Sequence, residues 1–238
     1  MEIVLFGLII LVASILQTST GFGFSILATP FLLLLFEPAE AIQINLVLSL
    51  VISSALLSKI KKDIERTILK RFIIGGMVGL PGGIIVFMFT ETTKLKLGIS
   101  VLLLALTVLL MLQFRIKQTQ KRDLVIGGIS GSLTTSIGMP GPPILLYFSG
   151  TDTPKERLRG TTLAFYLFIY FVSLVIQVGF AGTNATVWVS SAMALPLVII
   201  GLILGQRIFH KINQKMFTVF TYIILLFTGI YLLVESWI

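Results

Sequence analysis

The 238-residue sequence contains no cysteine and a single histidine, His210. The lack of cysteine excludes disulfide bonds, cysteine-ligated zinc and a thiol nucleophile. His210 lies in the basic segment RIFHKINQK, where we expect a solvated loop residue. The serines therefore have no intramembrane histidine to activate them, and no G-x-x-x-x-G-K-[ST] motif for ATP is present. We expect no enzyme, no catalytic residue, no cofactor and no metal.

Charged residues are scarce, at 12% of the chain, whereas hydrophobic residues make up 56%. Soluble domains are about a quarter charged. Apolar runs of helical length repeat along the chain, which predicts an all-α integral membrane protein in a lipid bilayer. We attribute the net charge of +8 to basic cytoplasmic loops and expect no nucleic-acid partner. The N-terminal stretch MEIVLFGLIILVASILQ lacks a basic n-region and a cleavage site, so we expect it in the mature protein.

Six apolar runs come close to the roughly 20 residues that a membrane crossing requires. They are 41–58, 72–90, 97–114, 162–180, 187–206 and 217–234.

Two further regions, 1–36 and 123–149, are interrupted by the sequences QTSTGFGFS and TTSIGMPGPP. The first apolar arm, residues 3–16, would cover about 21 Å at 1.5 Å per residue. The hydrocarbon core of a bilayer is about 30 Å thick. We therefore expect each arm to be too short to cross by itself.

The basic residues predict the direction of each segment. All but two of the 18 lie in four loops, 59–71, 115–122, 150–160 and 207–215, which we place in the cytoplasm. The segment 123–149 runs from one of these loops to the next, so it enters and leaves by the same face as a re-entrant hairpin. The segment 1–36 is either a second hairpin, entering from outside, or a broken span. With two hairpins, both termini are external.

This order, a hairpin and three spans followed by a hairpin and three spans, predicts two halves of opposite orientation, because three is an odd number. We predict inverted repeats over 1–114 and 123–238 that form one membrane domain, an arrangement frequent in secondary transporters. The sequences agree: SILQTSTGFGFSILATPFLLL resembles GSLTTSIGMPGPPILLY, and AIQINLVLSL aligns with LRGTTLAFYL.

The interruptions predict a site for a small anion. A broken helix presents an N-terminus with unpaired N–H groups and about half a positive charge. Pro142 and Pro143 suit the first turn of such a helix, and Phe24 or Ser25 would begin its counterpart. The alternative is that the breaks serve helix packing alone. The candidate substrate-binding residues are Thr20, Gly21, Gly23, Ser25, Asn45, Thr135, Ser136, Gly138, Gly141 and Thr162.

Other features of the spans narrow the class of solute. No Asp, Glu, Lys or Arg lies in the middle of a predicted span. This argues against a cation substrate and leaves no carboxylate for proton coupling. The pairs Gly75/Gly79 and Gly201/Gly205 have the small-xxx-small spacing that predicts close helix packing rather than binding.

The paired glycine–proline hairpins, each followed by a helix such as LRGTTLAFYLF, resemble the sulfite exporter TauE/SafE family of membrane permeases. That family usually shows G-x-G-G-G in both repeats, and the corresponding positions here read GFGFS at 21–25 and SIGMP at 136–140. The resemblance implies movement of small anions such as sulfite or other organosulfur species across an inner membrane. Our first hypothesis is a secondary transporter that exports sulfite or an organosulfonate, with one repeat rocking against the other in alternating access.

The alternatives are a passive small-anion channel and a membrane assembly protein that transports nothing. The sequence leaves open the exact substrate, the coupling ion, the direction of transport and the oligomeric state, including a homodimer.

Overall fold

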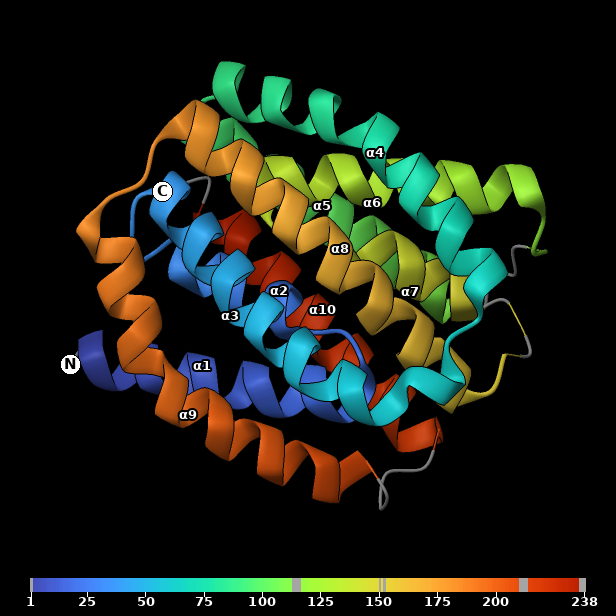
Figure 1. Cartoon of the computed structure of the whole chain (residues 1–238). Coiled ribbons are helices and arrows are strands. Elements are labelled where there is room, and N and C mark those ends of the chain that lie inside the picture. Colours follow the sequence, from blue (N-terminus) through green and yellow to red (C-terminus); the bar gives the residue numbers. More distant parts are fainter. Residues whose placement is uncertain (1, 113–116, 150, 152, 210–213, 236–238) are drawn as a thin grey trace.

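The computed structural model describes residues 2–112, 117–149, 151, 153–209 and 214–235 (Figure 1). His210 lies outside the described residues. The described part contains ten α-helices and one short 3-10 helix, and no strand. These are α1 (Glu2–Thr20), α2 (Phe24–Leu32), α3 (Pro38–Ile60), η1 (Lys61–Asp63), α4 (Arg66–Phe89), α5 (Thr92–Met111), α6 (Gln120–Ile137), α7 (Gly141–Ser149), α8 (Lys155–Ala181), α9 (Ala185–Phe209) and α10 (Gln214–Glu235).

The all-helical prediction is confirmed for the described residues. A helix lies over the described part of each of the six predicted runs, namely α3, α4, α5, α8, α9 and α10. Five helices in the described residues are long and apolar enough to cross a membrane, namely α1, α3, α4, α8 and α9. Large apolar side chains such as Val78, Phe171 and Ile203 point outward from these helices. Such a surface is unfavourable in water and favourable in lipid.

The expectation of short arms is wrong for the first arm of each interrupted region. α1 has 19 residues and α6 has 18, so each is about 27–29 Å long. The polar clusters do not end these helices, because their hydroxyls bond within the helix: Thr20 Oγ1 donates to the Leu16 carbonyl and Ser136 Oγ to that of Ser132. Each region therefore pairs a long first helix with a second helix of nine residues.

The interruptions themselves are confirmed, and glycines with left-handed backbone geometry form them. Gly21 and Gly23 have φ of 87° and 116°, and Gly138 has φ of 73°. Other residues adopt such angles only with strain. α2 begins at Phe24, and Pro142 and Pro143 lie in the first turn of α7, as predicted. The chain therefore reverses at residues 21–23 and 138–140.

Both interrupted regions are hairpins that return to the end where they started, so a broken span over 1–36 is wrong. The ring of Phe36, just after α2, lies 5.5 Å from that of Phe6 near the start of α1. The Tyr147 hydroxyl of α7 contacts Asp123 and Thr119 at the start of α6. Figure 1 shows that α1 starts at the end of the bundle opposite to the one where α6 starts. The two hairpins therefore enter from opposite ends.

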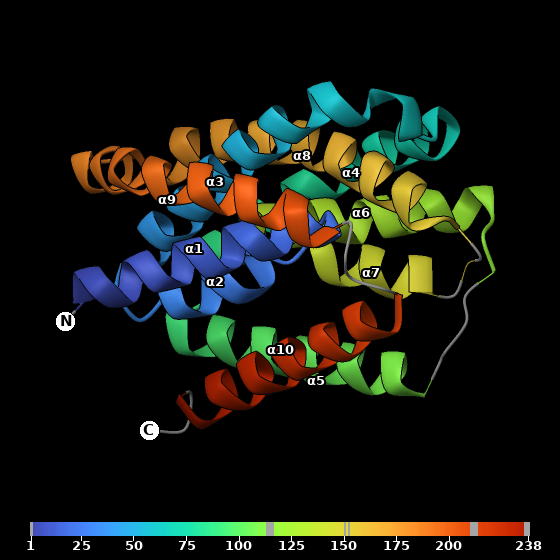
Figure 2. The ribbon, with the colours of Figure 1, turned by 90° about the horizontal axis from the view of Figure 1, so that it is seen from below.

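The helices pack in pairs that combine the two halves of the chain. α1 packs on α9 and α6 on α4, while α3 packs on α8 and α5 on α10. Figure 2 shows α5 and α10 together along one side of the bundle. A side-chain carbon at Gly75 or Gly79 would overlap the backbone of α6, and one at Gly201 or Gly205 would overlap α1. The packing role predicted for these glycines is confirmed.

Candidate functional site

The short helices α2 and α7 approach each other inside the bundle. Figure 2 shows α2 toward the end that holds the N-terminus and α7 toward the opposite end, and residues of the two helices are in contact. The contact lies at their N-terminal turns, because a side-chain carbon on Gly141 would lie 3.4 Å from Ile26 Cδ1. Two helix N-termini, each with a positive partial charge, thus share one buried region.

The N-terminus of α2 has no side-chain cap. Gly23 precedes it and supplies no side-chain cap, and the first intrahelical bond runs from Leu27 N to the Gly23 carbonyl. The N–H groups of residues 24–26 therefore have no partner within the helix. Ser25 is buried and its Oγ accepts a long hydrogen bond of 3.4 Å from the Tyr170 hydroxyl.

Two tyrosines of α8 point toward the short helices from the side. Tyr166 and Tyr170 are one turn apart, fully buried, with ring centroids 5.2 Å apart. Tyr170 reaches Ser25 at the start of α2. The Tyr166 hydroxyl oxygen lies 2.9 Å from the position that a side-chain carbon on Gly141 would occupy. Only glycine fits at 141 without moving this tyrosine.

The second hairpin is held from α3. Asn45 Nδ2 donates to the Gly138 carbonyl at 2.8 Å, while Asn45 Oδ1 is buried with no partner among the described residues. Thr162 occupies the aligned position on α8, and its buried hydroxyl also lacks a partner in the described chain. Buried polar atoms usually have partners, so these two oxygens mark a region equipped for more than apolar packing.

The structure does not bring all ten predicted residues together. The hydroxyl hydrogens of Thr135 and Ser136 are donated to carbonyls of their own helix, and that of Thr20 to the carbonyl of Leu16 or Phe22, which leaves lone pairs rather than donors for a ligand. Gly21 is packed against the backbone and Cγ of Arg159. Ser25 lies in the first turn of α2 and Gly141 in the first turn of α7, the two turns that meet at Ile26.

The family model described as Sulfite exporter TauE/SafE matches residues 6–232, nearly the whole chain. The chain belongs to the sulfite exporter TauE/SafE family. Comparisons with curated proteins and with solved structures found no match. Membership makes the protein a multi-pass membrane transporter of the sulfite and small-anion exporter class, and a member of a transporter family rather than an enzyme family.

Two buried charges in this TauE/SafE member are absent from the predicted site. Arg159 was grouped with the loop 150–160, but it lies in α8 with 6% of its surface exposed. Its guanidinium donates to the Thr18 carbonyl near the end of α1 and lies 4.2 Å from the centre of the Phe209 ring. A cation suits the negative end of a helix. The 3.6-residue pattern could have found it, because Arg159 shares a face with Thr162 and Tyr166.

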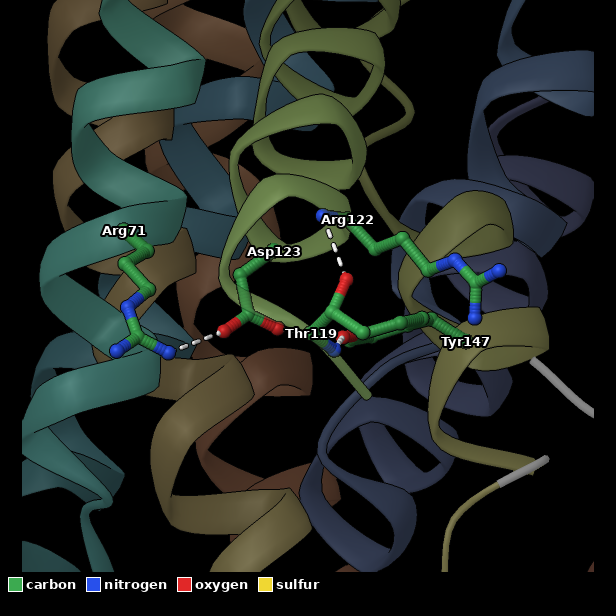
Figure 3. Close-up of polar contacts among 5 residues, drawn as sticks. All are labelled: Arg71, Thr119, Arg122, Asp123 and Tyr147. Atoms are coloured by element: carbon green, nitrogen blue, oxygen red, sulfur yellow. Dashed lines mark hydrogen bonds and ion pairs between the residues drawn. The ribbon is translucent and has the colours of Figure 1, made fainter. Parts of the chain in front are cut away.

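The second charge, Asp123, lies at the start of the second hairpin rather than in the middle of a predicted span. Asp123 is fully buried in the first turn of α6, and its Oδ2 lies 2.9 Å from Nη1 of Arg71 on α4 (Figure 3). The Tyr147 hydroxyl donates to Asp123 Oδ1 and accepts from Thr119 N. This cluster joins α4, α6 and α7. Its signal in the sequence was the helix N-cap Thr119 followed by an acidic first turn.

Two hollows open near these charges. One, of about 340 Å³, is lined by residues that include Asp63, Glu156, Arg159 and Phe209. The other, of about 540 Å³, is lined by Arg71 and Arg157 among others. Both lie at the end of the bundle that carries the predicted cytoplasmic loops, and the first reaches the arginine that contacts the end of α1.

Proposed function

We propose that this protein exports sulfite or a related small sulfur-containing anion across the inner membrane as a secondary transporter. Residues 1–114 and 123–238 act as inverted repeats. The basic loops lie on the cytoplasmic side of the membrane and both termini on the external side. The substrate binds between the N-terminal ends of α2 and α7. The observation that carries the proposal is the approach of these two ends at Ile26 and Gly141 inside the bundle.

The packing supports the repeats. In the proposed repeats, α1, α3, α4 and α5 of the first half correspond to α6, α8, α9 and α10 of the second. When each helix is replaced by its counterpart, the packed pair α1–α9 becomes the packed pair α6–α4. The pairs α3–α8 and α5–α10 become themselves. The motif Thr-Ser-x-Gly occurs at 18–21 and at 135–138, at the same place in each hairpin. Both facts are expected of two related halves around one axis.

The burial of the second hairpin favours alternating access over a passive channel. Residues 134–148 are all buried, so a solute can reach the tip of α7 only when neighbouring helices separate. A permanently open pore would need wetted polar groups along its whole length. The buried, partner-free oxygens of Asn45 and Thr162 would gain partners when a substrate or its water binds.

Uptake of radiolabelled sulfite into inside-out vesicles tests the proposal, and we expect saturable flux. Gly138→Leu should lower that flux at least about tenfold, because residue 138 has φ of 73° and a side-chain carbon there would lie 2.7 Å from Asn45 Nδ2. Gly179→Leu is the matched control, since nothing lies within 4 Å of a side-chain carbon at Gly179 of α8.

The outcomes separate the alternatives. Flux that rises linearly with sulfite without saturating would indicate a channel. No sulfite flux in the wild type would favour an assembly protein. Wild-type flux in Gly138→Leu would indicate that the break in the second hairpin is not part of the binding site.

A further inference from the structure

The hydroxyl of Tyr166 lies where the N-termini of α2 and α7 approach each other, and it has no hydrogen-bond partner among the described residues. Tyr166 is 0% exposed. Its ring packs on Phe165 and Tyr170, while its oxygen lies beside Gly141, the first residue of α7. A buried phenol hydroxyl normally has a partner. Its lack of one here, beside a helix N-terminus, leaves an O–H that can bond to a ligand.

The N-terminus of α7 has few donors of its own. Its first three residues are Gly141, Pro142 and Pro143, and proline has no N–H. Gly141 therefore supplies the one N–H of that turn, whereas the first turn of α2 supplies three, from residues 24–26. The positive helix dipole remains at α7, but hydrogen bonds to an anion must come from elsewhere.

Tyr166 is placed to supply one. The hydroxyls of Thr135 and Ser136 donate within their own helices, that of Thr20 lies against the carbonyls of Leu16 and Phe22, and Tyr170 donates to Ser25. The Thr162 hydroxyl is also without a partner in the described chain, but it is not among the atoms next to Gly141. The side chains that meet at Gly141, from Ile26 and Tyr166, are uncharged. An anion bound there is held by neutral donors, of which a phenol O–H is a strong and directional one.

We propose that Tyr166 donates its hydroxyl hydrogen to an oxygen of the transported anion and so determines affinity for small oxyanions such as sulfite. This inference rests on the proposed function, because it assigns a substrate contact within the site between α2 and α7. It makes Tyr166 a binding residue, not a support for the fold.

Sulfite uptake by inside-out vesicles carrying Tyr166→Phe tests the inference. We expect the KM to rise roughly tenfold, as for loss of one hydrogen bond to a charged group, with the maximal rate little changed. The melting temperature of purified Tyr166→Phe should not fall, because the hydroxyl has no protein partner. Sulfite should raise that melting temperature less than it raises the wild-type value.

Tyr147→Phe is the matched control. It also removes a buried tyrosine hydroxyl, but one bonded to Asp123 and Thr119, so it should lower the melting temperature and leave the KM unchanged. A wild-type KM in Tyr166→Phe would overturn the inference and leave the proposed function standing. A marked fall in its melting temperature would also overturn it, by showing that the hydroxyl holds the fold. Absence of saturable sulfite flux in the wild type would contradict both the inference about Tyr166 and the proposed function.

Discussion

At the scale of single residues, the polar groups buried in this exporter have two kinds of surroundings. The Asp123 carboxylate has two partners, Arg71 and Tyr147, and lies in the first turn of its helix, where a negative charge is favourable. Asn45, Thr162 and Tyr166 each keep an oxygen without a partner in the described residues. A satisfied cluster contributes rigidity, whereas an unsatisfied one costs stability that only a bound ligand or water recovers. The first kind indicates a structural role, and the second is where a ligand or a water molecule can bind.

Asp123→Asn should therefore destabilise the protein. We expect a loss of about 2–3 kcal/mol, less than the 3–5 kcal/mol of a fully buried pair, because Arg71 is partly exposed and can turn to water. The measurement is unfolding in detergent followed by tryptophan fluorescence. Arg157→Gln is the control: its contact with Glu65 is 3.7 Å long and exposed, so the change should stay below about 1 kcal/mol. Equal losses of stability in the two variants would show that the Asp123–Arg71 ion pair contributes no more than an exposed ion pair.

At the scale of elements, the glycines of α4 determine how closely it can approach α6. Gly75, Gly79 and Gly83 each face a backbone carbonyl of α6, at Leu124, Gly128 and Ser132. This spacing repeats every four residues, so one face of α4 lies directly against the long arm of the second hairpin. The second hairpin is thereby fixed through its long helix, α6, while its short helix, α7, lies at the proposed site.

Gly79→Ala should disturb this interface, because the added carbon would overlap the Gly128 carbonyl. Overpacking of this kind costs about 1–3 kcal/mol, which a lower melting temperature in detergent would reveal. Gly82→Ala on the same helix is the matched control, since its added carbon would lie 3.7 Å from Ser132 Oγ and alanine favours helix by up to about 1 kcal/mol. A melting temperature of Gly79→Ala at or above that of Gly82→Ala would contradict the interface.

At the scale of the whole molecule, the two hairpins start at opposite ends of one bundle, and the buried charges Arg159 and Asp123 gather toward one of those ends. α8 begins at that end, beside η1, and finishes at the other, where Gln43 donates to the Gly182 carbonyl and Asn184 to Glu40. The two ends can therefore be labelled separately.

Because the chain has no cysteine, each introduced cysteine is the sole thiol. A membrane-impermeant maleimide should label Thr183→Cys in intact cells, and Lys62→Cys only after the cells are permeabilised, if the basic loops are cytoplasmic. The reverse pattern would invert the proposed orientation. Labelling of both positions from outside would contradict a bundle whose two ends lie on opposite sides of the membrane.

Much of this architecture could be read from local pattern. The apolar runs gave the helices, the glycines and prolines at 21–23 and 138–140 gave the breaks, and the positions of the basic loops predicted that 123–149 returns to its starting face. The lengths of the long arms were underestimated, because Thr20 and Ser136 look like interruptions in a hydropathy reading but bond to their own helices.

The sequence by itself determined an all-helical membrane protein with two interrupted regions, because hydrophobic length, backbone freedom at glycine and loop charge are properties of neighbouring residues. The tertiary structure alone decided that Arg159 meets Thr18, that Asp123 meets Arg71, and that Tyr166 lies beside Gly141 with its hydroxyl unpaired. These contacts join different helices, in part from opposite halves of the chain. Only the packing of one helix on another determines which polar groups find partners and which stay unpaired.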